Sequence, residues 1–292
     1  MSQGIPVLLM KIKTRDGITL EGIYTKPRKR SKTALIWLHG LTSRFSSGQS
    51  LIKELSSQLS RSGIGYFKFN TRGHDIVIRG PKHPLGAAFE KFEDCILDIQ
   101  AVINLAKNLG YKKVILAGHS TGANKALYYK YKTHDPRVFG LILLGPTSDI
   151  AYDYLAFGKK TIRQRIYLAE KLKKNNATSL LPQKFGIWTA QRFISILKEG
   201  KAEDVFPYYN LKARWKELKS VKAPVAVILG SRDEYLDRPA KKLIAIFRQN
   251  ARNAASFSGI VIKRANHGFY GKEKELTGEL IRWVVKLHRK TK

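Results

Sequence analysis

Short continuous runs of apolar residues recur along the chain, with helical patterns between most of them. The apolar runs occupy residues 34–38, 65–70, 113–117, 139–144, 224–229 and 260–263. Each run has the length and composition of a strand that is buried on both faces. The apolar positions recur with helical spacing in residues 49–61, 89–109, 123–131, 239–247 and 273–287. This alternation predicts a mostly parallel sheet that is covered by helices on both faces.

The first two segments have a different pattern. Residues 7–13 and 18–25 alternate between apolar and polar positions on either side of Arg15-Asp16-Gly17. Asp-Gly between such segments is a strong signal for a β-hairpin. We therefore expect the chain to open with antiparallel strands.

One interval interrupts the alternation of strands and helices. Residues 148–220 are helical, aromatic and basic in character, and they contain no convincing strand. Ordinary connections span about 2 to 6 residues, so an interval of this length should carry structure of its own. We predict a helical cap at 148–220, inserted into a core domain formed by residues 1–147 and 221–292.

Composition adds a strong positive charge. The 292 residues include 54 Lys and Arg against 22 Asp and Glu, a formal net charge of +32. Such a field attracts polyanions and anionic surfaces non-specifically. Because the basic residues extend from Lys11 to Lys292 and form no single tract, we expect no dedicated nucleic-acid site. The hydrophobic fraction of 43% excludes disordered and fibrous classes.

The N-terminal residues, the lengths of the apolar stretches and the cysteine content lead us to expect a cytoplasmic protein. Residues 1–6 lack the basic region and apolar run of a secretory signal, and no stretch approaches the roughly 18 apolar residues of a membrane span. Cys95 is the single cysteine, which fits a reducing compartment. Its neighbours Ile96 and Ile99 predict a small buried hydrophobe rather than a catalytic thiol.

The clearest chemical motif is Gly118-His119-Ser120-Thr121-Gly122. It follows the predicted strand 113–117 and precedes the predicted helix 123–131, which is the informative context for G-x-S-x-G. The tight turn strains the backbone of the serine, and the glycines leave room for the chain to pass its neighbours. Ser120 is therefore a candidate nucleophile, although a serine at this place can also serve only as a helix N-cap.

A nucleophilic serine needs a base within hydrogen-bond reach, and the base needs a third group to orient it. Asp233 follows the run 224–229, and His267 follows the run 260–263. We therefore predict His267 as the general base and Asp233 as the residue that orients it. Asp149 lies just past residue 144 and is the alternative acid.

Taken in order and context, these motifs resemble those of the α/β-hydrolase superfamily over nearly the whole chain. His39-Gly40 resembles the oxyanion loop, and Asn70-Thr71-Arg72-Gly73-His74 resembles the strand-end turn. Residues 118–122 match the nucleophile elbow, while Asp233 and His267 match the acid and histidine positions. The resemblance implies an eight-stranded, mostly parallel sheet with flanking helices and a helical cap after the sixth strand.

The resemblance also assigns supporting roles. It implies that the backbone N–H groups of Leu41 and Thr121 stabilise the oxyanion. It places His39 and His119 beside the elbow, where they support the site rather than catalyse the reaction. The sequence has no Cys/His cluster and no G-x-G-x-x-G after a strand, so we expect neither a metal nor a dinucleotide cofactor.

The predicted activity is hydrolysis of a small carboxylic ester through an acyl-serine intermediate. A thioesterase, a peptidase or a C–C-bond hydrolase would use the same residues. A non-catalytic protein that binds anionic partners is the alternative from another class. Cap aromatics either line a cleft for an acyl or aromatic ester or form the core of the cap itself. They are Tyr152, Tyr154, Phe157, Tyr167, Phe185, Trp188, Phe193, Phe206, Tyr208, Tyr209 and Trp215.

Overall fold

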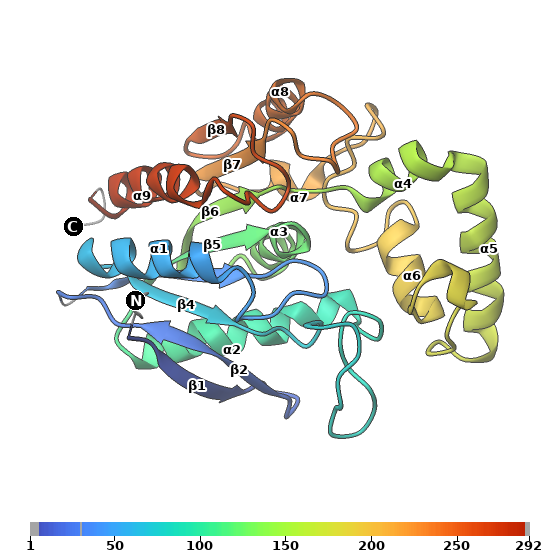
Figure 1. Cartoon of the computed structure of the whole chain (residues 1–292), viewed down its shortest axis with the longest axis horizontal. Helices are drawn as coiled ribbons and strands as arrows, with labels where there is room; N and C mark the ends of the chain where they lie inside the picture. The colour runs from blue at the N-terminus through green and yellow to red at the C-terminus, as the bar shows by residue number, and fades with distance from the viewer. Residues whose placement is uncertain (1–5, 30, 290–292) are drawn as a thin grey trace.

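The computed structural model describes residues 6–29 and 31–289, and its centre is one eight-stranded sheet (Figure 1). In spatial order the strands are β1 (Leu8–Lys13), β2 (Thr19–Thr25), β4 (Gly65–Phe69), β3 (Thr33–Leu38), β5 (Lys113–His119), β6 (Val138–Leu144), β7 (Val225–Gly230) and β8 (Phe257–Ile262). β2 pairs antiparallel with β1 and with β4, whereas the other neighbours pair in parallel. The predicted sheet and its opening hairpin are confirmed.

Helices cover both faces of the sheet. Leu55 of α1 (Gln49–Arg61) and Leu280 of α9 (Glu273–Arg289) belong to the hydrophobic cluster on one face. The cluster on the other face includes residues of α2 (Cys95–Asn108), α3 (Thr121–Thr133) and α8 (Ala240–Asn250). Cys95 is fully buried in this second cluster, as expected from its apolar neighbours.

The starts of two elements differ most from the prediction. The helix predicted from residue 89 begins at Cys95, after a short 3-10 helix, η1 (Phe92–Asp94). The preceding backbone is held by the loop before it, because the N–H groups of Ala87 and Ala88 donate to Asp75 O and Ile76 O. β8 begins at residue 257 rather than 260, since residues 257–259 pair with β7 even though Ser258 and Gly259 interrupt the apolar run.

The interval between β6 and β7 contains helical elements and an isolated bridge between Leu180 and Thr189. The elements are α4 (Asp149–Phe157), α5 (Lys159–Asn175), η2 (Gln183–Phe185), α6 (Ala190–Leu197) and α7 (Lys216–Lys219). Helices α4, α5 and α6 lie to one side of the sheet (Figure 1), and α5 and α6 share their own hydrophobic cluster.

The aromatic residues of the interval 148–220 divide between two clusters. Phe193 packs in the cluster of α5 and α6, with Phe185 against it. Phe206, Tyr208 and Trp215 instead pack in the cluster that includes α8. The stretch that leads into α7 therefore packs with the sheet, while α5 and α6 bury their apolar faces mainly against each other.

Within residues 6–29 and 31–289, no helix has both the length and the apolar character needed to cross a bilayer.

Candidate active site

Ser120 lies in a strained turn between β5 and α3. Its backbone angles are φ 55° and ψ −128°, a region that a residue with a side chain rarely adopts. A Cβ atom at Gly118 would lie 2.1 Å from the carbonyl oxygen of Gly122, and one at Gly122 would lie 2.3 Å from that of Leu38. Both flanking positions therefore require glycine, which explains the G-x-S-x-G spacing at this turn.

His267 and Asp233 form a buried hydrogen-bonded pair. Asp233 follows β7 and His267 follows β8, so both lie at the carboxyl edge of the sheet. Nδ1 of His267 is 3.0 Å from Oδ1 of Asp233 and 2.9 Å from Oδ2. An ionised carboxylate can only accept, so this contact places the proton of a neutral imidazole on Nδ1 and leaves Nε2 unprotonated. The backbone N–H of Tyr235 donates to Oδ1 of Asp233 at 3.0 Å and helps to hold the carboxylate.

Gly145 is the point at which Ser120 and this pair approach each other. The N–H of Ser120 donates to the carbonyl oxygen of Leu144 at 2.8 Å, next to Gly145 in the chain. A Cβ atom at Gly145 would lie 3.0 Å from Cε1 of His267 and 3.6 Å from Oδ2 of Asp233. In the described part of the chain, the Ser120 hydroxyl forms no hydrogen bond with His267.

His119 and His39 hold loops of the site in place. Nε2 of His119 donates to the carbonyl oxygen of His267 at 2.9 Å, and the two rings are 4.9 Å apart. Nε2 of His39 accepts from the N–H of Thr71 at 3.0 Å, so Nδ1 carries the proton and donates to Gly40 O at 2.9 Å. Burial lowers the pKa of His39 to about 3 and that of His119 to about 4. Both rings are therefore neutral at physiological pH.

The predicted oxyanion donors lie on two segments that flank Ser120. A Cβ atom at Gly40 would lie 3.6 Å from Oγ of Ser120, and Leu41 is the next residue. Thr121 is the first residue of α3, so its N–H has no acceptor within the helix. Among the described residues, the N–H of Leu41 donates to no protein acceptor either. Both N–H groups are thus available to an oxygen atom near Ser120.

Asp149, the alternative acid, is not paired with His267. It lies in the first turn of α4, and among the described residues its carboxylate has no hydrogen-bond partner. Burial raises the pKa of Asp149 to about 7. The structure thus brings His267 together with Asp233 rather than with Asp149.

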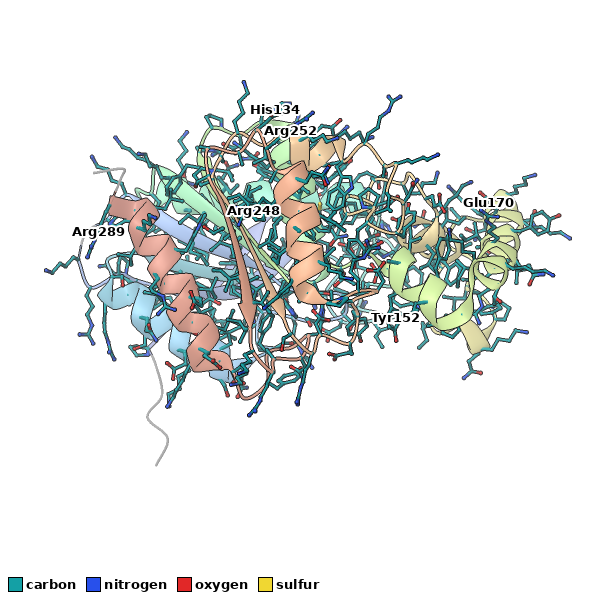
Figure 2. All side chains as sticks on the ribbon, turned by 90° about the horizontal axis from the view of Figure 1, so that it is seen from above. His134, Tyr152, Glu170, Arg248, Arg252 and Arg289 are labelled. Atoms are coloured by element: carbon teal, nitrogen blue, oxygen red, sulfur yellow. The ribbon has the colours of Figure 1, made fainter. Side chains whose placement is uncertain are left out.

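Sequence reasoning missed Glu234 and Tyr235, and it did not place Tyr152 next to them. Oε2 of Glu234 accepts from the N–H of His267 at 2.9 Å, and the ring of Tyr235 lies 4.6 Å from the imidazole. Tyr152 of α4 packs against Tyr235 at 4.9 Å, at the boundary between the sheet and the inserted helices (Figure 2). Glu234 and Tyr235 directly follow Asp233, which is a usable signal, whereas Tyr152 was predicted only as one of the aromatics that either line a cleft or form the core of the insertion.

Among the described residues, no group of three or more His, Cys, Asp and Glu side chains is arranged to hold a metal ion.

A comparison with protein-family models matches residues 1–288 to the family described as "Protein of unknown function (DUF1749)". The chain belongs to the DUF1749 family. No curated protein matches the sequence of this DUF1749 protein. Solved structures share its fold, a mostly parallel eight-stranded sheet with flanking helices, which is the fold that the motifs implied.

Three of these structures cover almost the whole DUF1749 chain. Est1E from Butyrivibrio proteoclasticus, solved with ferulic acid bound, is 18% identical with a TM-score of 0.65, over 95% of this chain and 98% of its own. A monoglyceride lipase from Saccharomyces cerevisiae is 14% identical with a TM-score of 0.70, over 99% and 98%. The siderophore hydrolase EstB from Aspergillus fumigatus is 19% identical with a TM-score of 0.68, over 98% of both chains. At these identities the likeness establishes the fold alone.

Proposed function

We propose that this DUF1749 protein is a serine hydrolase that cleaves carboxylic esters, with Ser120 as nucleophile, His267 as general base and Asp233 as its orienting acid. The observation that carries the proposal is the convergence of a strained serine and a hydrogen-bonded histidine–carboxylate pair beside Gly145. Catalytic hydrogen bonds often tighten only when substrate is in place. We therefore expect Nε2 of His267 to form its hydrogen bond with Oγ of Ser120 when substrate binds.

In the proposed mechanism, Oγ of Ser120 attacks the ester carbonyl carbon while Nε2 of His267 takes the hydroxyl proton. The carbonyl oxygen becomes an oxyanion, to which the N–H groups of Leu41 and Thr121 donate. Collapse of this intermediate releases the alcohol, which leaves with the proton from His267. Water then attacks the acyl-serine with His267 as base, and the free acid departs as Ser120 regains its proton. Asp233 keeps the imidazole oriented and stabilises its charged form.

Two observations support a small ester with an acyl or aromatic part as the substrate. The rings of Tyr235 and Tyr152 form an aromatic wall next to the imidazole of His267. Proteins with the same fold include an esterase that was solved with ferulic acid bound and a monoglyceride lipase. We further propose that residues 148–220 act as a cap over this site and that the protein works in the cytoplasm.

A panel of esters tests the proposal. We expect the wild type to hydrolyse at least one of short-chain p-nitrophenyl esters, long-chain p-nitrophenyl esters and methyl ferulate. Ser120→Ala should lower kcat by about 10³-fold or more, because no other group can form the acyl intermediate. Ser179→Ala, in the loop after α5, is the matched control and should leave kcat unchanged. Equal turnover by wild type and Ser120→Ala, or no turnover of any ester by wild type, would contradict the proposal.

A further inference from the structure

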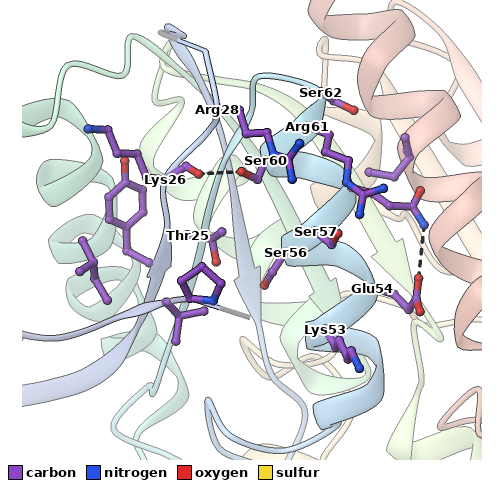
Figure 3. Close-up of a pocket in the computed structure, with 16 residues that line it drawn as sticks. Thr25, Lys26, Arg28, Lys53, Glu54, Ser56, Ser57, Ser60, Arg61 and Ser62 are labelled. Carbon is purple, nitrogen blue, oxygen red and sulfur yellow. Dashed lines mark hydrogen bonds between the residues drawn. The ribbon is translucent and has the colours of Figure 1, made fainter. Parts of the chain in front are cut away.

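A groove of about 920 Å³ lies at the end of the strands that is opposite to Ser120. It is bounded by the β1–β2 hairpin and helix α1 (Figure 3). Thr25, at the end of β2, pairs with Tyr66 near the start of β4, so the groove opens at the amino ends of the parallel strands. Ser120 follows the carboxyl end of β5. The groove is therefore separate from the candidate active site.

Two hydroxyl groups in the wall of the groove are buried without a partner. Oγ1 of Thr25 and Oγ of Ser56 form no hydrogen bond with any described residue, although Thr25 is 4% exposed and Ser56 is 0% exposed. Buried polar groups are nearly always paired, because a lone one loses its bonds to water without replacement. Figure 3 shows the two side chains on facing elements, Thr25 on β2 and Ser56 on α1. Both residues line the groove, and both hydroxyls are unused donors.

The same groove carries an excess of positive charge. Lys26, Arg28, Lys53 and Arg61 line it, and none of them forms an ion pair with a described residue. Glu54 is the acidic residue in the lining. Guanidinium groups together with hydroxyl donors match the oxygen atoms of a phosphate group.

Hydrogen bonds connect the two segments that carry Arg28 and Arg61. The N–H of Arg28 donates to the carbonyl oxygen of Ser60 at 2.9 Å, and Oγ of Ser60 donates to the carbonyl oxygen of Lys26 at 2.8 Å. These bonds join the segment after β2 to the last turn of α1, which carries Arg61. These hydrogen bonds thus keep Arg28 and Arg61 at one groove rather than on independent surface loops (Figure 3).

We propose that this groove binds a phosphate ester. The hydroxyls of Thr25 and Ser56 donate to the phosphate oxygens, and Arg28 and Arg61 balance the negative charge. Val7 and Leu8, which are 39% and 56% exposed, contact the apolar part of the ester. A soluble phosphate ester and a lipid headgroup share this chemistry, and the experiment separates them.

The hydroxyls are tested without any change of charge. Phenyl phosphate is titrated calorimetrically at physiological salt into wild type and into the Thr25→Val/Ser56→Ala variant. We expect the variant to bind about tenfold more weakly or worse, the loss expected for a hydrogen bond to a charged group. Its Tm without phosphate should equal or exceed that of wild type, because the two hydroxyls have no protein partner to lose. Unchanged affinity, or a lowered Tm, would overturn the proposal.

A second pair of variants separates the groove from general attraction by a chain of net charge +32. Arg28→Gln/Arg61→Gln should weaken phenyl phosphate binding, whereas Lys171→Gln/Lys173→Gln on α5 should leave it unchanged. Equal losses in both variants would show non-specific attraction and overturn the proposal. Co-sedimentation with phosphatidic acid vesicles that Thr25→Val/Ser56→Ala abolishes assigns a lipid headgroup, whereas binding of phenyl phosphate alone assigns a soluble ester. Ser120→Ala should bind like wild type, so failure of ester hydrolysis leaves this test intact.

Discussion

Asp233 and Asp149 both follow strands at the carboxyl edge of the sheet, yet their surroundings differ. The carboxylate of Asp233 accepts from His267 and from the N–H of Tyr235. The carboxylate of Asp149 has no hydrogen-bond partner among the described residues, and burial raises its pKa to about 7. A group that orients a histidine must be an acceptor that is held in place, and at this edge Asp233 meets that condition.

Substitution of the two acids should therefore have unequal effects. We expect Asp233→Asn to lower kcat on a p-nitrophenyl ester by about 10⁴-fold, because an amide no longer selects the imidazole tautomer with an unprotonated Nε2. Asp149→Asn should change kcat little. Steady-state kinetics of the two variants decide between the acids, and the reverse order of effects would assign the role to Asp149.

The buried ring of His39 predicts how stability depends on pH. The pKa of its imidazole is lowered to about 3 in the folded protein, against 6.5 for an ordinary histidine. Above pH 6.5 the ring is neutral in both states. Between pH 6.5 and about 3 only the unfolded chain binds the proton, so the free energy of unfolding falls by up to about 1.4 kcal/mol per pH unit from this group.

Urea unfolding at pH 7, 6 and 5 tests this prediction. His39→Asn should be less stable than wild type at pH 7, because it loses bonds to Thr71 and Gly40. The difference between the two proteins should narrow as the pH falls, since only the wild type loses the contribution of His39. A difference that stays constant from pH 7 to pH 5 would show that His39 does not titrate in this way.

At the scale of elements, the strands were predictable because burial on both faces leaves a continuous apolar run. All six side chains of β3 are buried, and the predicted run 34–38 falls within this strand. The start of α2 was not predictable, because it depends on the loop before it, where distant carbonyl oxygens hold the backbone of residues 87 and 88. The local sequence pattern predicts an element when the burial of its own residues decides the conformation. It fails when a contact with residues distant in the sequence decides the conformation.

The same distinction applies to the candidate site. Ser120, Asp233 and His267 each stand directly after a strand, so their place along the sequence already indicated a common edge. Tyr152 comes from α4, and its approach to Tyr235 depends on how that helix packs. The common location of Ser120, Asp233 and His267 was therefore predictable from the core strands, whereas the approach of Tyr152 to Tyr235 was not.

A buried ion pair anchors the inserted helices. Arg192 of α6 is 0% exposed, and its guanidinium bonds to Glu203, with one distance of 2.9 Å, and to the carbonyl oxygen of Ala87 at 3.0 Å. Glu90, which pairs with Lys125 of α3, lies 3.4 Å from the same guanidinium. These contacts join α6 to segments of the core. In sequence, Arg192 is one basic residue among many in the insertion.

Loss of this arginine should be costly. We expect Arg192→Ala to lower the free energy of unfolding by about 3–5 kcal/mol, because Glu203 would remain buried without its counter-charge. Urea unfolding followed by circular dichroism measures the change. The double variant Arg192→Met/Glu203→Leu should recover much of the loss, since it removes both charges. A single variant as stable as wild type would show that the pair does not anchor α6.

At the scale of the whole molecule, the two proposed functions use opposite ends of the strands of one sheet. The candidate active site uses the carboxyl ends of β5, β7 and β8, and the phosphate groove uses the amino ends beside β2. The chain has a net charge of +32, and basic side chains project from the surface on all sides of the view in Figure 2. Both sites therefore lie in a positively charged surface. Specific binding must therefore be separated from general attraction by variants that leave the net charge unchanged or that change it by the same amount.

The proposed function depends above all on the acylation of Ser120 with help from His267. The most direct measurement is mass spectrometry of the protein after reaction with a fluorophosphonate, which forms a stable adduct with an activated serine. We expect one adduct per chain on the peptide that contains Ser120, and no adduct in Ser120→Ala. We expect much slower labelling in His267→Ala, because the hydroxyl then lacks its base. An adduct that persists in Ser120→Ala, or a wild type that is not labelled, would show that Ser120 is not the nucleophile.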